Sequence, residues 1–192
     1  MSTFTESDLT FTFPPAWVVR QFDRTAAYRS VSGHGLKGVD FLALGPDDEL
    51  WLIEVKNFRR RDARTSMLRR TPVKLAEQIA RKFTDTRRLI DIMAVAMDRR
   101  RWMSIRLRWD RLRNRGPEAS HYLFWREVSR RSALPRIRCL LWLETPESAT
   151  DYAEAVRELL APRIPPGSKL IIAETESTEP LPVSVTINPV VP

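Results

Sequence analysis

The pattern of apolar and polar residues predicts an alternation of strands and helices along the chain. Apolar residues spaced three and four apart from Leu75 to Met97 predict a long helix, which Thr71 caps with Pro72 at its first position. A second helix is expected from Ser148 to about residue 160, and a short one near residues 25–31. Short apolar or alternating runs between turn-forming residues predict strands at 9–13, 17–22, 38–44, 50–56, 137–143 and 169–173, and an edge strand at 183–187.

One hairpin has the clearest pairing. Two apolar runs flank the turn-forming segment 45–49, which predicts antiparallel strands. A turn centred on Asp47 places Asp40 opposite Glu54, and side-chain alternation puts Lys56 on the same face. Directly opposed Cβ atoms lie roughly 4.5–5.5 Å apart, so the two carboxylates repel each other unless a positive charge lies between them. A divalent cation, with Lys56 alongside, is the charge that this arrangement favours.

The composition is that of a single folded domain. At 192 residues the chain is long enough to bury a sizeable core, which we expect at about 9–98 and 136–174, with a basic arginine-rich helical insertion at about 99–135 and a tail at 175–192. The one cysteine, Cys139, excludes a disulfide framework and favours a reducing compartment. The N-terminus lacks a signal-peptide pattern and no run reaches 18 apolar residues, so we expect a soluble, cytoplasmic protein with no membrane contact.

Positive charge is concentrated in the middle of the chain. Residues 57–138 carry 24 Lys and Arg against 8 Asp and Glu, a net +16, whereas 1–56 and 139–192 have net charges of −3 and −5. A basic block directly after a candidate metal site indicates a polyanion such as nucleic acid. The alternative is a solvated basic face, which the acidic flanks argue against. The basic side chains assigned to nucleic-acid binding are Arg59, Arg60, Arg61, Arg69, Arg70, Lys74 and Lys82.

Arginine and tryptophan dominate the later part of this basic block. Trp102, Trp109 and Trp125 stand among many arginines between residues 98 and 138. Arginine pairs bidentately with phosphate, and aromatic rings can stack on bases. We assign these arginines to binding and leave the tryptophans open between core anchors and stacking platforms.

The hairpin residues resemble a known motif. Asp40, then thirteen residues, then Glu54-Val55-Lys56 is similar to the pattern of the PD-(D/E)xK phosphodiesterase superfamily, which includes restriction endonucleases, Holliday-junction resolvases and many repair and phage-defence nucleases. The resemblance covers residues 36–98 and implies a restriction-endonuclease-like α/β fold, a central mixed sheet flanked by helices. It also implies that Asp40, Glu54 and the carbonyl of Val55 hold the metal, and that Lys56 orients or activates the attacking water. Oxygen-only ligands favour Mg²⁺ or Mn²⁺ over zinc.

The chain departs from this pattern in two places. Val39 stands where the family usually has proline, and no N-terminal helix carries the extra glutamate that many members use. In resolvase-like and exonuclease-like branches, the helix after the lysine strand carries a glutamine near the metal. Gln78 resembles that glutamine, and it equally fits an exposed polar position on its helix. Lys74 and Lys82, one turn away on either side, are expected to contact phosphate rather than to catalyse.

Together these features predict a magnesium-dependent nuclease that hydrolyses phosphodiester bonds, in DNA rather than RNA, with a role in phage defence or DNA repair. The alternative is a non-catalytic nucleic-acid-binding or interaction subunit of a multi-protein complex that keeps the nuclease fold. The intact set of Asp40, Glu54 and Lys56 favours the enzyme, because a pure binder has no need to oppose two carboxylates. The proline-containing tail is a candidate contact for a protein partner.

Overall fold

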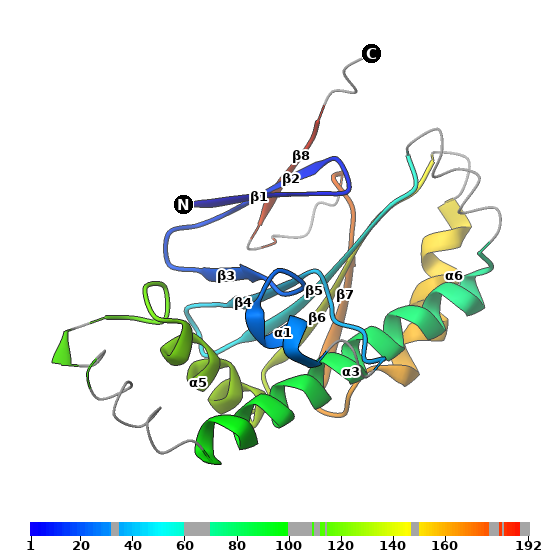
Figure 1. Cartoon of the computed structure of the whole chain (residues 1–192). Coiled ribbons are helices and arrows are strands. Elements are labelled where there is room, and N and C mark those ends of the chain that lie inside the picture. Colours follow the sequence, from blue (N-terminus) through cyan, green and yellow to red (C-terminus); the bar gives the residue numbers. More distant parts are fainter. Residues whose placement is uncertain are drawn as a thin grey trace.

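The computed structural model describes residues 1–31, 35–59, 70–99, 109, 112–113, 115–146, 150–176, 181 and 183–188. They form a mixed α/β arrangement of three layers, with a five-stranded sheet between a three-stranded sheet and a layer of helices (Figure 1). The strands are β1 (Ser2–Glu6), β2 (Leu9–Phe13), β3 (Val18–Gln21), β4 (Phe41–Leu44), β5 (Leu50–Asn57), β6 (Ile137–Glu144), β7 (Ser168–Ala173) and β8 (Ser184–Ile187). The helices are α1 (Ala26–Val31), α3 (Pro72–Arg99), α5 (His121–Ser132) and α6 (Thr150–Leu160), and a 3₁₀ turn follows at Ala161–Arg163.

The five-stranded sheet is mixed and has the order β3-β4-β5-β6-β7. The pairs β3–β4 and β4–β5 are antiparallel, whereas β5–β6 and β6–β7 are parallel. Parallel neighbours require a crossover, and α3 with α5 supplies the first and α6 the second. The helices therefore cover one face of this sheet, as Figure 1 shows. All five strands lie where the sequence predicts them.

The two faces of β5 belong to two different cores. Leu50 and Leu52 pack in the core under the helices, whereas Trp51, Ile53 and Val55 pack against the three-stranded sheet. Burial on both faces explains why β5 reads as a continuous apolar run rather than an alternating one. It also makes Glu54, in the row of Leu50 and Leu52, a carboxylate inside the helix-covered face.

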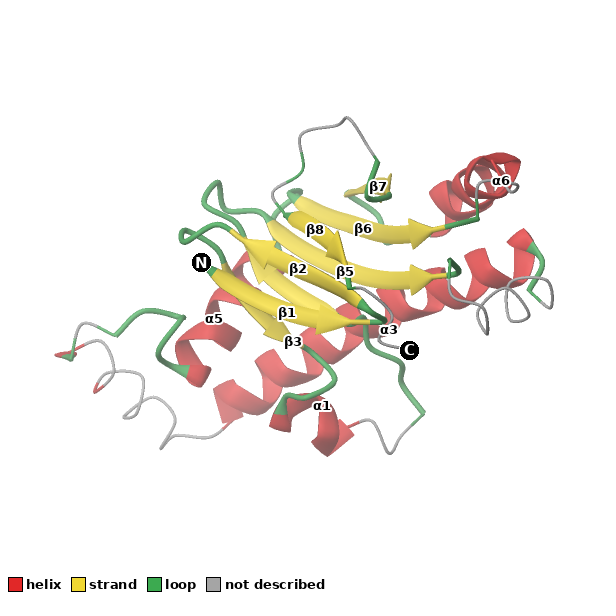
Figure 2. Cartoon of the chain, turned by 90° about the horizontal axis from the view of Figure 1, so that it is seen from above, coloured by secondary structure: helices red, strands yellow, loops and turns green. Residues whose placement is uncertain are grey.

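The second sheet has the order β1-β2-β8 and lies over the central strands, as the view from above shows (Figure 2). Leu9, Phe11 and Phe13 of β2 are completely buried. The sequence predicts β2 and the edge strand at 183–187 as strands, and both are confirmed, but nothing in the pattern assigns them to a separate sheet. β1 is not predicted, because Phe4 alone interrupts its polar residues.

Helices α3 and α6 lie where the sequence predicts helices. Thr71 caps α3, since its hydroxyl accepts a hydrogen bond from the Lys74 N–H at 3.4 Å. In α5, Trp125 is 1% exposed and packs against Phe22, which assigns this tryptophan to the core. Ser148, the expected cap of α6, lies outside the described residues, as does Trp102. Within the described residues, no helix is long and apolar enough to span a membrane.

Candidate active site

The β4–β5 hairpin brings Asp40 and Glu54 together on the helix-covered face. The predicted register is confirmed by the pairs Leu42↔Leu52 and Leu44↔Leu50, and the ladder ends at Phe41↔Ile53. Asp40 lies just before this ladder, and its N–H donates to the Ile53 carbonyl at 3.1 Å. Its carboxylate reaches across to β5, where Oδ2 accepts a hydrogen bond from the Val55 N–H at 2.7 Å. These two hydrogen bonds to the backbone of β5 fix Asp40 next to Glu54.

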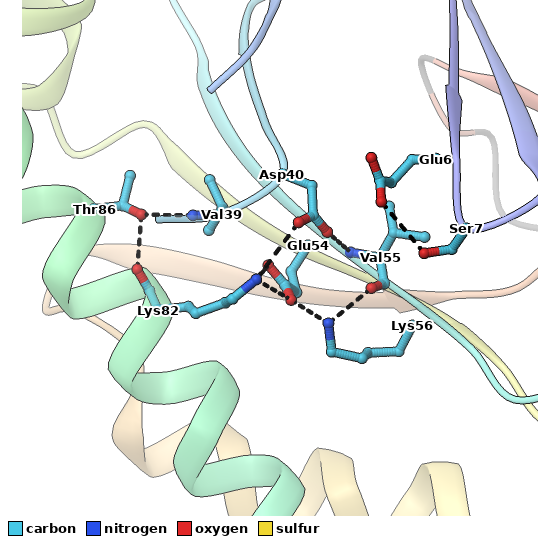
Figure 3. Close-up of polar contacts among 9 residues, drawn as sticks. All are labelled: Glu6, Ser7, Val39, Asp40, Glu54, Val55, Lys56, Lys82 and Thr86. Atoms are coloured by element: carbon cyan, nitrogen blue, oxygen red, sulfur yellow. Dashed lines mark hydrogen bonds and ion pairs between the residues drawn. The ribbon is translucent and has the colours of Figure 1, made fainter. Parts of the chain in front are cut away.

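A lysine from α3 lies between the two carboxylates. Lys82 Nζ is 2.7 Å from Glu54 Oε1, 2.8 Å from Glu54 Oε2 and 3.5 Å from Asp40 Oδ1 (Figure 3). Lys56 Nζ contacts Glu54 Oε1 as well and donates to the Val55 carbonyl at 3.0 Å. The positive charge that opposed carboxylates require is therefore supplied, in this structure, by two ammonium groups. The sequence predicts Lys56 at this position, whereas it predicts Lys82 as a phosphate contact.

Burial and charge act in opposite directions on these groups. Glu54 is completely buried, and burial raises the pKa of its carboxyl, as does the charge of Asp40, while Lys56 and Lys82 act to lower it. Burial alone would lower the pKa of Lys82, but Glu54 and Asp40 outweigh it and raise the pKa. Lys82 is therefore a firmly charged ammonium, held by buried acceptors.

The position of Lys82 is fixed by hydrogen bonds between α3 and the chain that leads to Asp40. The Thr86 hydroxyl donates to the Lys82 carbonyl at 2.7 Å and accepts from the Val39 N–H at 3.1 Å. One residue earlier on α3, Asp85 Oδ2 accepts from the Lys37 N–H at 3.1 Å. These bonds hold one turn of α3 against the strand that carries Asp40.

Gly38 permits a close approach in the same segment. A Cβ at this position would lie 2.7 Å from the ring of Phe22 and 2.8 Å from that of Tyr28. Phe22 is 1% exposed, so its ring has little room to move. A larger residue at 38 would therefore require the aromatic rings or the backbone two residues before Asp40 to shift.

An additional carboxylate comes from the tip of the β1–β2 hairpin. Glu6 lies close enough to Asp40 for their charges to interact, and burial first, then the charge of Asp40, raises the pKa of Glu6 (Figure 3). The turn beside it is strained, because Ser7 and Asp8 have φ values of 52° and 62° without being glycine. Asn57 fixes this turn to the end of β5 by donating to the Ser7 carbonyl at 2.8 Å. Because β1 is not predicted, the sequence offers no signal for Glu6.

The remaining predicted site residues are spread over different environments. Gln78 and Lys74 are exposed on α3. Among the described residues of this helix, the side chain that contacts Asp40 and Glu54 is Lys82, not Gln78. The Arg70 carbonyl accepts a hydrogen bond from Tyr152 at 2.9 Å, which anchors the start of α3 to α6. Arg60, Arg61 and Arg69 lie outside the described residues.

Arg59 is held by a second buried carboxylate, Glu144, at the end of β6. Arg59 Nε lies 2.9 Å from Glu144 Oε2, and Arg59 also contacts the exposed Glu176 at 3.3 Å. Glu144 is completely buried and accepts from Trp142 Nε1 at 2.9 Å and from the Thr175 N–H at 2.7 Å. Arg59 is thus anchored by an ion pair within the protein, and its predicted contact with nucleic acid stays a prediction.

Several arginines of α5 and β6 are likewise paired within the protein. Arg130 Nη2 lies 2.5 Å from Asp48, and Arg138 Nη2 lies 2.6 Å from Glu49, both in the turn between β4 and β5. On α5 itself, hydrogen bonds from Arg130, opposed by burial and helped by Arg131, lower the pKa of Glu127 to about 2. These arginines are held by ion pairs with acidic groups of the protein, and their assignment to nucleic-acid binding stays a prediction.

The oxygen atoms at the site match the donor set of a hard divalent cation. Asp40 Oδ1, the Glu54 carboxylate and the Val55 carbonyl all lie against the two lysine ammonium groups. Across the described parts of the chain, no group of three or more His, Cys, Asp or Glu side chains could hold a metal ion. The predicted set is smaller, with two carboxylates and one carbonyl, and such oxygen ligands suit Mg²⁺ with water completing its shell. The residues present therefore fit the expected ion.

The chain was also compared with known proteins. No family model matches it, and neither the curated proteins nor the solved structures include a significant match.

Proposed function

We propose that this protein is a magnesium-dependent nuclease with a restriction-endonuclease-like fold, which hydrolyses phosphodiester bonds in DNA rather than RNA. The observation that carries the proposal is the convergence of Asp40, Glu54 and Lys56 on β5: Asp40 accepts from the Val55 N–H, and Lys56 contacts both Glu54 and the Val55 carbonyl. The mixed sheet with its hairpin, α3 crossover and parallel β6 supports the same assignment.

The chain's own groups have distinct roles in this proposal. Asp40, Glu54 and the Val55 carbonyl would hold the ion, and Lys56 would orient the attacking water and stabilise negative charge that develops on the phosphate. A bound Mg²⁺ polarises a phosphoryl oxygen and lowers the pKa of a bound water. The hydrogen bond from the Val55 N–H holds the Asp40 carboxylate against β5, next to Glu54.

Part of the basic surface remains available for a polyanion. Lys74, Arg88 and Arg99 are exposed along α3, the helix that also supplies Lys82. Exposed cations on the helix that supplies Lys82 support binding through the nucleic-acid backbone, with affinity that falls as salt rises. A role in phage defence or DNA repair is part of the proposal, and so is a partner at the tail, although residues 184–187 pair with β2.

One observation favours a second candidate function, a non-catalytic nucleic-acid-binding subunit. Lys82 and Lys56 already neutralise both carboxylates, so the cluster could serve as a buried structural ion network. In that case the protein would bind DNA without cutting it, and metal would change neither its stability nor its activity.

The test is cleavage of linear, circular, nicked and branched DNA and of RNA, with Mg²⁺ or with EDTA. We expect magnesium-dependent cleavage that is abolished by Asp40→Ala, Glu54→Ala and Lys56→Ala, while DNA binding is retained. Glu158→Ala and Lys169→Ala, which change exposed residues on α6 and β7, are matched controls and should cut normally. Cleavage at the wild-type rate by all three site variants would refute the proposed site. Binding without any metal-dependent cleavage would favour the non-catalytic subunit.

A further inference from the structure

Lys82 occupies the position between Asp40 and Glu54 that a divalent ion would need. Its ammonium nitrogen lies within hydrogen-bonding distance of both Glu54 oxygens, at 2.7 and 2.8 Å, and 3.5 Å from Asp40 Oδ1. Among the described residues, Lys82 is the one cation in contact with both carboxylates. Lys56 contacts Glu54 and the Val55 carbonyl but not Asp40. Figure 3 shows it extending from α3 into this space.

We propose that Lys82 competes with the metal for Asp40 and Glu54, and that it passes to the substrate phosphate when the metal binds. This inference rests on the proposed nuclease function. It makes Lys82 a positioning residue that sets metal affinity and couples it to the arrival of an anion, a role that differs from both direct catalysis and a permanent phosphate contact.

The competition follows from geometry and charge. Mg²⁺ binds oxygen at roughly 2.0–2.1 Å, so it would compete for the carboxylate oxygens that now accept hydrogen bonds from Lys82. A dication beside the Lys82 ammonium would also be repelled by it. Binding of a divalent ion therefore favours movement of Lys82 away from its carboxylate partners.

The coupling to phosphate follows from where Lys82 can go. Its backbone is held by Thr86, so only the flexible side chain can move, and that side chain is 17% exposed. Beside a bound dication the displaced ammonium is repelled unless an anion comes close to it. A phosphate group on the substrate supplies this anion, so metal and substrate should each increase the affinity for the other.

The experiment measures Mn²⁺ and Ca²⁺ binding by calorimetry, with no nucleic acid present, for the wild type and for Lys82→Met. Loss of a charged hydrogen-bond donor that competes for the same oxygens should raise metal affinity by about tenfold to a hundredfold. Lys169→Met, which removes an exposed lysine on β7, is the control and should leave metal affinity unchanged. Lys82→Gln is a second variant that keeps a neutral donor of similar length, and it should also bind metal more tightly.

A non-cleavable phosphodiester oligonucleotide then tests the coupling. It should increase the metal affinity of the wild type more than that of Lys82→Met. Unchanged or weaker metal affinity in both Lys82 variants would overturn the inference. In that case the proposed function would still stand if Asp40→Ala abolished metal binding in the wild-type background. If neither wild type nor any Lys82 variant bound metal, the metal-dependent function itself would fail, and the inference with it.

Discussion

The hydrogen bond between Asp40 and the Val55 N–H leads to a prediction that differs from simple charge repulsion. Two opposed carboxylates alone would make the metal-free protein more stable when Asp40 loses its charge. In the structure, however, Asp40 Oδ2 accepts from a backbone N–H of a residue that is 2% exposed, and Lys82 neutralises the pair. Removing the Asp40 carboxylate leaves the buried Val55 N–H without its hydrogen-bond acceptor.

The expected magnitudes separate the two roles of this side chain. A hydrogen bond to a charged group contributes about 1.5–3 kcal/mol, so Asp40→Ala should destabilise the protein by about 2–3 kcal/mol. Asp40→Asn keeps an acceptor oxygen and should cost about 1 kcal/mol, because a neutral bond replaces a charged one. For a chain of this length each kcal/mol lowers the Tm by roughly 2–4 °C.

The assay is urea unfolding in EDTA, together with thermal melting, so that no metal contributes. Asp47→Ala changes an exposed aspartate in the same hairpin and should stay within about 0.5 kcal/mol of the wild type. The reasoning would be wrong if Asp40→Ala were as stable as the wild type. It would also be wrong if Asp40→Asn were more stable, because repulsion between the carboxylates would then outweigh the bond to Val55.

Two further predictions concern buried and paired carboxylates away from this bond. Glu144→Ala should destabilise the protein by about 3–5 kcal/mol in urea unfolding, because it leaves Arg59 and the Thr175 N–H without their buried acceptor. The control, Glu176→Ala, changes the exposed partner of Arg59 and should cost less than about 0.5 kcal/mol. Glu127 has a folded pKa lowered from 4.5 to about 2, so its stabilising contribution is complete above pH 4.5 and is lost as the pH falls towards 2. Stability measured across this interval should therefore fall less steeply in Glu127→Gln, and an unchanged slope would contradict the pairing.

The local parts of the fold could be predicted from the sequence because local chemistry determines them. The turn-forming residues at 45–49 and the apolar runs beside them set the register Leu42↔Leu52. Thr71 and Pro72 mark the beginning of α3, and its apolar spacing predicts its buried face. These signals place Asp40 and Glu54 near each other without any knowledge of the tertiary structure.

The parts that depend on packing between distant segments could not be predicted. Helical periodicity tells which face of α3 is buried, but Lys82 lies at the border of that face, and only the position of α3 over β5 decides whether it turns inward. The arginines of α5 and β6 are a similar case, because Arg130 and Arg138 are far in sequence from their partners Asp48 and Glu49 but adjacent to them in space. The separate three-stranded sheet depends on a pairing between β2 and β8 that no local pattern encodes.

That pairing also has a consequence for synthesis on the ribosome. β2 receives its second neighbour only when Ile187 has been made, as the pair Leu9↔Ile187 requires. At about 5–20 residues per second, translation of the intervening chain takes roughly 10–35 s. For that time β2 presents an unpaired edge next to three large apolar side chains, a template for wrong strand pairing. β8 thus covers an edge of β2 that stays open for as long as the chain between them is being made.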